Sequence, residues 1–148
     1  METVTKYTPK QKTTNFQFRY NEPLGEAHCP YAYRWVFIFF GVSIRIHKWL
    51  RSEPIKHQHD HAWNFLTICL KGGYIDISKD GIDKFRVGCI RYRKATHIHN
   101  VVLPKNKTCW TLLFCSKPKR KWGFWVDGRI KRPLKYFHKY GHPPCSEQ

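Results

Sequence analysis

The chain of 148 residues carries 27 Lys and Arg against 10 Asp and Glu, which gives a formal net charge of +17 at pH 7. Hydrophobic residues make up 41% of the sequence and aromatic residues 16%, so a packed core can form and wholesale disorder is excluded. The length suits one compact domain. No apolar run approaches the roughly 20 residues that cross a bilayer, and the polar residues 1–12 lack the apolar stretch of a signal peptide. We therefore expect a cytoplasmic protein without membrane contact, and the six cysteines, spread singly along the chain, agree with that compartment.

The elements predicted along the chain are an irregular lead-in and then a series of short strands. Residues 1–32 are predicted as an N-terminal arm, residues 33–130 as a β-barrel and residues 131–148 as a basic C-terminal tail. Dense β-formers, alternating polarity and intervening turn residues predict the strands, which cover residues 36–40, 42–46, 65–70, 74–77, 85–92, 97–103, 110–114 and 122–126. The sequence shows no convincing amphipathic helix, so the pattern predicts an all-β sandwich or barrel.

Five of the nine histidines fall in two tight groups, at residues 57–61 and 97–99. On a strand, His57, His59 and His61 would share one face, because alternate side chains point the same way. If the two groups lie on neighbouring strands, three or four imidazoles converge. Neutral imidazole is a common ligand of Zn, Fe, Cu and Ni. The histidines therefore predict a metal site, with contact to an anion at the surface and hydrogen bonding in the core as the alternatives.

The sequence around these histidines resembles a known family. Residues 59–65 read His-Asp-His-Ala-Trp-Asn-Phe and residues 70–74 read Leu-Lys-Gly-Gly-Tyr. Small cupin-like proteins of bacteria and phages have a similar first motif, H-D-H-P-W-x-F followed by L-x-G-G-Y. The second half is also similar, with Arg-Lys-Trp-Gly-Phe at 120–124, and the resemblance covers residues 42–130. It implies a cupin-like double-stranded β-helix, a jelly-roll barrel, here with an N-terminal arm and a basic C-terminal extension.

The resemblance also implies a metal site, once its motif is carried over residue by residue. The ligands would be His59, His61 and His99, and the cofactor a divalent transition metal, Fe first, with Zn, Mn or Ni as alternatives. The glutamate that cupins place after the paired histidines falls here on Phe65 or Leu66, neither of which can bind a metal.

The missing carboxylate leaves two alternatives for the site. Either three histidines act alone, or a carboxylate comes from elsewhere, and Asp60 is the nearest candidate in the sequence. Asp60 would point to the opposite face of an ideal strand, so we expect it to support the site or the fold. His57 and His97 are the candidate catalytic residues, as groups behind the ligands or as proton carriers near the metal.

The excess of positive charge predicts an anionic ligand. Arg91 and Arg93 precede the second histidine group and could guide an anion to the metal, while Lys119, Arg120 and Lys121 adjoin a tryptophan as in a surface that binds phosphates and stacks bases. The aromatic candidates for lining a pocket, with a place in the core as the alternative, are Trp63, Tyr74 and Trp110.

Two functions of different classes follow from these features. The first is a metal-binding cupin, a mononuclear non-heme enzyme of dioxygenase or isomerase type, as the resemblance implies, acting on an anionic small molecule or nucleotide. The second is a cupin-like binder of nucleotides or nucleic acid without catalysis, which as a viral protein would act in the host cytoplasm. A third, phosphate hydrolysis or transfer with His97 and His99 as acid and base, has less support. The sequence leaves a homo-oligomer open.

Overall fold

The computed structural model describes residues 15–26, 28–53 and 56–141, and these form short antiparallel strands with one short helix. No helix in these ranges has the length and apolarity to cross a bilayer. The elements are β1 (Phe16–Glu26), β2 (Cys29–Phe39), β3 (Val42–Trp49), β4 (Phe65–Lys71), β5 (Gly73–Ser78), β6 (Gly81–Arg86), β7 (Ile90–Arg93), β8 (His99–Val102), β9 (Cys109–Cys115), β10 (Phe124–Val126), β11 (Arg129–Lys131) and α1 (Pro133–Tyr140).

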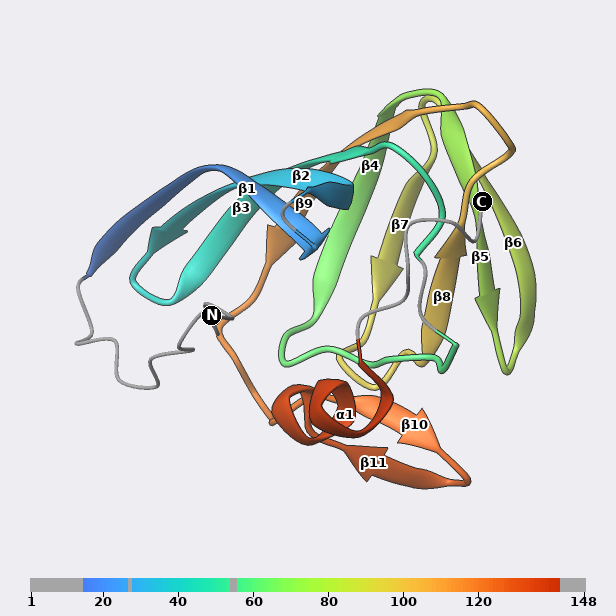
Figure 1. Cartoon of the computed structure of the whole chain (residues 1–148). Helices are drawn as coiled ribbons and strands as arrows, with labels where there is room; N and C mark the ends of the chain where they lie inside the picture. The colour runs from blue at the N-terminus through green and yellow to red at the C-terminus, as the bar shows by residue number, and fades with distance from the viewer. Residues whose placement is uncertain (1–14, 27, 54–55, 142–148) are drawn as a thin grey trace.

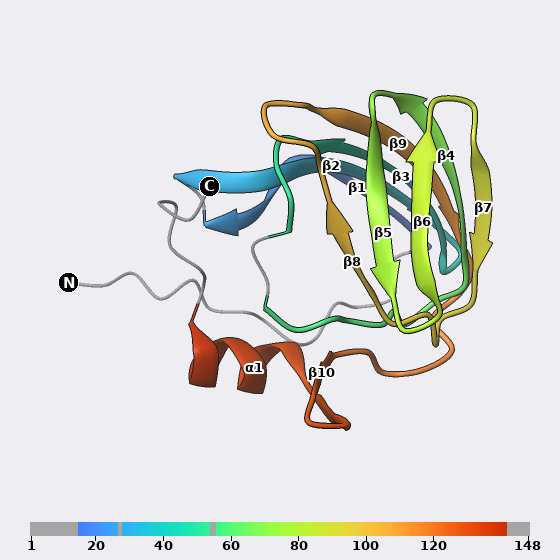
Figure 2. The ribbon, with the colours of Figure 1, turned by 90° about the vertical axis from the view of Figure 1, so that its right-hand side faces the viewer.

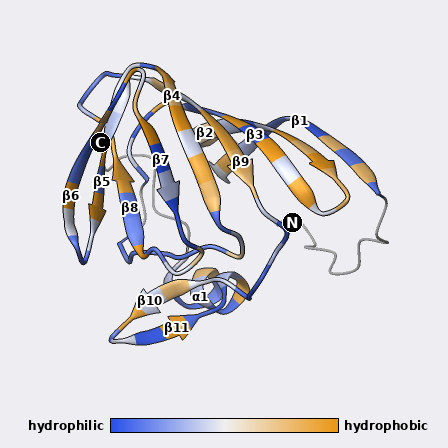
Figure 3. Ribbon diagram, turned by 180° about the vertical axis from the view of Figure 1, so that it is seen from behind, coloured by the Kyte–Doolittle hydropathy of each residue, from blue (hydrophilic) through white to orange (hydrophobic). Residues whose placement is uncertain are grey.

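Two antiparallel sheets lie face to face (Figures 1 and 2). The larger sheet has the order β1-β2-β3-β9-β4-β7, and the smaller has the order β6-β5-β8. The non-consecutive order arises because the chain crosses from one sheet to the other after β4, β6, β7 and β8. Apolar residues dominate β4 and β9 in the middle of the larger sheet (Figure 3). The architecture is an all-β jelly roll.

Alternation along the central strands decides which side chains face the smaller sheet. On β3 the inward set is Ser43, Arg45, His47 and Trp49, and the strand register aligns this set with alternate residues of β9 and β4. The main core lies between the sheets, and its buried residues are Ala32, Trp49, Cys69, Phe85, Val101, Leu103 and Cys109.

The glycine pair between β4 and β5 permits a close backbone approach. Gly72 has a φ of +74°, in the left-handed region, and a Cβ added there would lie 2.1 Å from the carbonyl oxygen of Thr108. Only glycine fits such a position without distortion. This explains the Gly-Gly of the Leu-Lys-Gly-Gly-Tyr segment in physical terms.

A small unit of β10, β11 and α1 covers one end of the jelly roll (Figure 1). Its core consists of Phe124, Val126 and Tyr136. The helix begins with Pro133 in its first turn and ends at Gly141, whose φ is +68°, which are common start and stop signals. The segment containing His59 connects this unit to the smaller sheet, because His59 forms isolated bridges to both His99 and Phe124.

Three parts of the structure differ from the sequence prediction. Residues 16–26, predicted as part of an arm, form β1 and pair with β2, so the boundary at residue 33 falls inside the larger sheet; residues 1–14 lie outside the described residues. The strand predicted over 85–92 is divided into β6 and β7, because these belong to different sheets and the chain turns at Gly88.

The C-terminal tail, predicted as a basic extension, contains α1. This helix has only eight residues, of which only Tyr136 is buried, so its amphipathic pattern is too short to stand out in the sequence. Residues 142–148 lie outside the described residues.

Cys29 is disulfide-bonded, whereas Cys69, Cys89, Cys109 and Cys115 are free.

Candidate metal centre

Three histidines from the two sequence groups meet between the sheets. His59 and His61 come from the segment between β3 and β4, and His99 begins β8. One potential ligand atom of each lies within 4.8 Å of the other two. The Nε2 atoms of His61 and His99 are 2.9 Å apart. The structure thus brings together the three histidines that the sequence predicts as ligands.

Backbone hydrogen bonds hold the first histidine segment in place. The amide of His59 donates to the carbonyl of His99 at 3.1 Å, and the amide of His99 donates back at 3.0 Å. The amide of His61 donates to the carbonyl of Ala95 at 3.0 Å. Because only His59 lies in a bridge, the segment is not the regular strand that the sequence suggested.

His57 lies away from the three histidines. Its Nδ1 is 2.9 Å from the hydroxyl of Tyr136, and its ring contacts Tyr140, so it packs against α1. His57 is not part of the cluster that His59 and His61 form with His99, although an ideal strand would put His57 on the same face, and its catalytic role stays a prediction. His57 instead joins the histidine segment to the helix.

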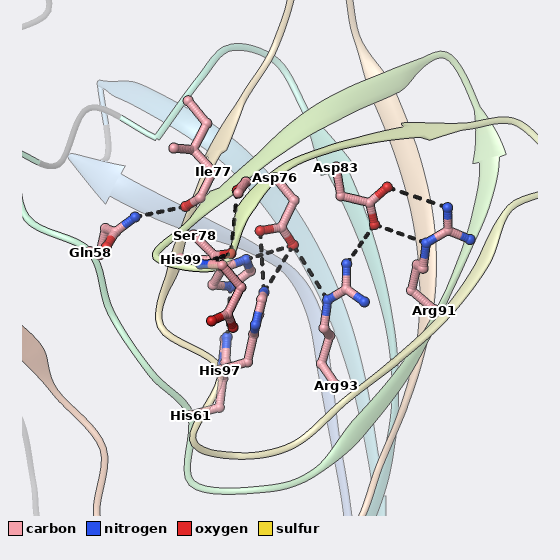
Figure 4. A network of polar contacts seen from close by, with 12 residues as sticks. Gln58, His61, Asp76, Ile77, Ser78, Asp83, Arg91, Arg93, His97 and His99 are labelled. Atoms are coloured by element: carbon pink, nitrogen blue, oxygen red, sulfur yellow. Dashed lines mark hydrogen bonds and ion pairs between the residues drawn. The ribbon is translucent and has the colours of Figure 1, made fainter.

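Asp76 on β5 orients the second histidine group (Figure 4). Its Oδ2 lies 3.0 Å from Nδ1 of His99, and its Oδ1 lies 3.2 Å from Nε2 of His97. Burial raises the pKa of this carboxyl, but hydrogen bonds from the two histidines outweigh that effect and lower it below the ordinary value. A carboxylate at Nδ1 of His99 keeps the proton there and leaves a lone pair on Nε2, which faces His61. His97 therefore shares a carboxylate with His99, and its catalytic role stays a prediction.

Glu53 provides a second buried carboxylate near the cluster. Its side chain is 6% exposed, its Oε2 accepts a hydrogen bond from the amide of Val101 at 3.0 Å, and the same oxygen lies 3.7 Å from Nδ1 of His59. That Nδ1 is buried and makes no hydrogen bond within the described structure. Sequence reasoning missed both Glu53 and Asp76. An acidic residue between the two apolar residues Ile75 and Ile77 is a sequence signal that could have identified Asp76, whereas no such signal marks Glu53.

Asp60, the carboxylate nearest the histidines in sequence, has a structural role. It is fully buried and accepts hydrogen bonds from the amide of Gly123 at 2.9 Å, from Nε1 of Trp125 at 3.1 Å and from Arg120. These contacts attach the histidine segment to the chain around β10. Asp60 thus supports the fold, as expected, and the carboxylates beside the histidines are Asp76 and Glu53.

The electrostatics of the cluster suit metal ligands. Burial, and then the neighbouring histidines, lower the pKa of His61 well below its ordinary value. Burial also lowers the pKa of His59, against a smaller opposing effect of Glu53. Both imidazoles are therefore neutral at pH 7. The neutral imidazoles of His59 and His61, the facing Nε2 atoms of His61 and His99, and a buried Nδ1 that makes no hydrogen bond within the described residues fit a divalent transition metal.

The histidines border two connected spaces. An inner cavity of about 170 Å³ lies between the sheets, and His59, His61 and His99 all line it. A wider outer groove of about 890 Å³ runs between β2 and α1 and also reaches His59. Its cationic side chains are Arg34, Arg51, Arg120, Lys121 and Arg132.

The three predicted pocket aromatics have different positions. Trp63 and Tyr74 line the inner cavity. Trp110 lines neither of the two spaces and stacks on Trp35 with ring centroids 5.7 Å apart. Its neighbour on β9, Thr111, lines the inner cavity instead, because alternate residues of a strand face opposite ways.

The predicted anion-binding residues differ in how far their charge is already neutralised. Arg91 and Arg93 both bind Asp83, at 2.8 Å and 2.6 Å, and so connect the two sheets (Figure 4). Arg120 is paired with Asp60 at the edge of the outer groove. Lys119 is exposed and lines neither space, whereas Lys121 lines the outer groove. Among these five, anion binding stays a prediction that the structure favours only for Lys121.

Comparison with solved structures identifies the fold as that of the cupins. The chain is similar to iron(II) HppE, with a TM-score of 0.55 and 10% sequence identity over 72% of this chain and 59% of that chain. It thus spans less than two thirds of that protein's length. It is also similar to Rru_A2000 from Rhodospirillum rubrum, described as a cupin-2 domain, with a TM-score of 0.54 and 10% identity over 89% of this chain and 86% of that chain.

These likenesses show the fold, and at 10% identity they show nothing finer. No protein-family model matches the sequence. No curated protein matches it either. The function must therefore be argued from the site.

Proposed function

We propose that this protein is a metal-dependent cupin enzyme, with His59, His61 and His99 binding one divalent transition metal. The observation that carries the proposal is the meeting of three imidazoles from distant segments within 4.8 Å, at the wall of an internal cavity. Iron is the first candidate, since HppE, which shares the fold, is described as an iron(II) protein. The reaction class we propose is oxygenation or isomerisation of a small anionic substrate.

The residues around the histidines would prepare the site for such chemistry. A bound divalent ion supplies Lewis-acid chemistry, and iron also supplies redox chemistry. Asp76 keeps the proton of His99 on Nδ1, so that Nε2 is available. His97 shares the same carboxylate and is 14% exposed, which suits it to exchange a proton with solvent close to His99. Trp63 and Phe65 cover the cavity beside His61 and limit the entry of water.

Metal analysis of the purified protein tests this proposal. We expect close to one equivalent of transition metal in the wild type, either as isolated or after anaerobic addition of Fe(II) and removal of excess. His59→Ala and His99→Ala should each lose it. His28→Ala is the matched control, because His28 is exposed and lines neither space. Wild-type protein that stays metal-free after reconstitution would overturn the proposal.

The outer groove supports a second candidate function, the binding of nucleotides or nucleic acid without catalysis. Arg51, Lys121 and Arg132 line it beside the aromatic rings of Trp122 and Phe137, the combination that binds phosphates and stacks bases. This function predicts that metal-free protein binds a single-stranded oligonucleotide with an affinity that falls steeply with salt. Unchanged affinity between low and high salt would exclude it.

A further inference from the structure

The inner cavity contains a guanidinium group that forms no ion pair with any carboxylate of the described residues. Arg45 points inward from β3 and lines the cavity together with His61. Its Nε donates to Oγ of Ser43 at 3.0 Å. Within the described ranges no ion pair involves Arg45, although Arg34 on the neighbouring strand pairs with Glu22 at 2.6 Å. A cation in such a place attracts an anion from solution.

Trp63 holds this guanidinium in a defined orientation. The Cζ atom of Arg45 lies 3.8 Å from the ring centroid of Trp63. Stacking of this kind covers a face of the guanidinium and leaves the N–H groups at its edge available for a planar anion. Burial lowers the pKa of Arg45 to about 10, which still leaves it charged at neutral pH.

Two more polar atoms in the cavity lack partners. Nε2 of His47 and Oγ1 of Thr67 are buried and make no hydrogen bond within the described structure, and both residues line the inner cavity. Arg45 and Thr67 are both paired with Leu113, so they belong to one cross-strand row, and His47 is the next inward residue on β3. Buried polar groups without partners indicate a place for a ligand or water.

We propose that the inner cavity binds a small oxyanion, a carboxylate or a phosphonate, with its charged end on Arg45 and further oxygen atoms on Thr67 and His47. The volume of about 170 Å³ suits a molecule of a few carbons better than a nucleotide. This inference names a substrate class for the proposed metal site, and it rests on the proposed function only in placing the other end of the molecule near the three histidines.

Calorimetric titration with glycolate and with methylphosphonate at constant ionic strength tests the proposal. Arg45→Met keeps the aliphatic stem and removes the charge. Arg86→Met removes the same charge from an exposed position on β6 that lines neither space, and it is the matched control. We expect Arg45→Met to weaken binding of at least one probe by tenfold or more, and Arg86→Met to change it by less than about twofold. The probe that binds distinguishes a carboxylate from a phosphonate substrate. Equal affinity of Arg45→Met and wild type, or no binding of either probe to wild type at millimolar concentration, would overturn the proposal.

A second variant covers the case in which Arg45→Met does not fold. Thr67→Val replaces the hydroxyl by a methyl group of the same shape, and we expect it to weaken probe binding at least about threefold. Unchanged binding in folded Thr67→Val would contradict the placement of the anion. Metal content, measured on the same samples, separates the two proposals. Arg45-dependent binding in a protein that takes up no metal would refute the proposed function alone, whereas a metal-loaded protein with Arg45-independent binding would refute only this inference.

Discussion

Asp76 is the carboxylate on which the orientation of two histidines depends, so Asp76→Asn is a sharp perturbation of the candidate site. The carboxylate is 5% exposed and accepts from Nδ1 of His99 at 3.0 Å and from Nε2 of His97 at 3.2 Å. Asparagine keeps the shape but has a single acceptor oxygen, and its NH₂ group cannot accept. One of the two imidazoles then loses its partner, and His99 is no longer held with its proton on Nδ1.

The expected effect on metal binding follows from this geometry. Loss of the hydrogen-bond partner behind a metal-binding histidine lowers metal affinity by about 10–100-fold, which corresponds to about 1.4–2.8 kcal/mol. The nearby guanidinium of Arg93, 3.8 Å from Asp76, also loses a compensating charge. We therefore expect a loss of about 1–3 kcal/mol in folding free energy as well, and metal affinity must be measured where the variant is fully folded.

Competition between the protein and a colorimetric zinc chelator measures this affinity directly. Asp83→Asn is the matched control, because Asp83 binds Arg91 and Arg93 but contacts none of the histidines. We expect the control to stay within about threefold of wild type. A folded Asp76→Asn variant with wild-type zinc affinity would refute the reasoning that the carboxylate prepares His99 for a metal.

Three further predictions concern stability. Burial lowers the pKa of His47 from 6.5 to about 3, so between these pH values the unfolded chain binds a proton that the folded chain does not, and stability falls as the pH decreases through this window. His47→Gln should therefore flatten the decline of the urea midpoint between about pH 7 and 4, measured with a chelator present. An unchanged slope would contradict this. Gly72→Ala places a Cβ 2.1 Å from a backbone oxygen at a φ of +74°, so it should lower the free energy of unfolding by at least about 2 kcal/mol. A loss below about 0.5 kcal/mol would be inconsistent with that contact. Asp60→Ala leaves three donors without their acceptor and should cost about 3 kcal/mol in chemical denaturation, so a loss under about 1 kcal/mol would argue against its structural role.

Local pattern was sufficient for much of this protein. Period-two alternation with turn residues predicted the central strands and the all-β class, because a half-buried strand must alternate in polarity. The motif around His59 and His61, with its glycine pair, pointed to the cupin fold and to the three histidines that the structure brings together. These features depend on residues near one another in the chain, where sequence spacing and spatial neighbourhood agree.

The remaining features depended on which strands became neighbours. Asp76 meets His99 only because β5 pairs with β8, and the strand register that decides this is a long-range property. The alternation along β9 predicts that Trp110 and Thr111 face opposite ways. It does not predict which of the two faces the cavity, because the position of the second sheet decides that. The edge strand β1, the short helix α1 and the uncompensated charge of Arg45 likewise arose from packing between segments distant in sequence. The sequence thus determined the residue types of the site, while the tertiary structure decided the partners and the orientation of these residues.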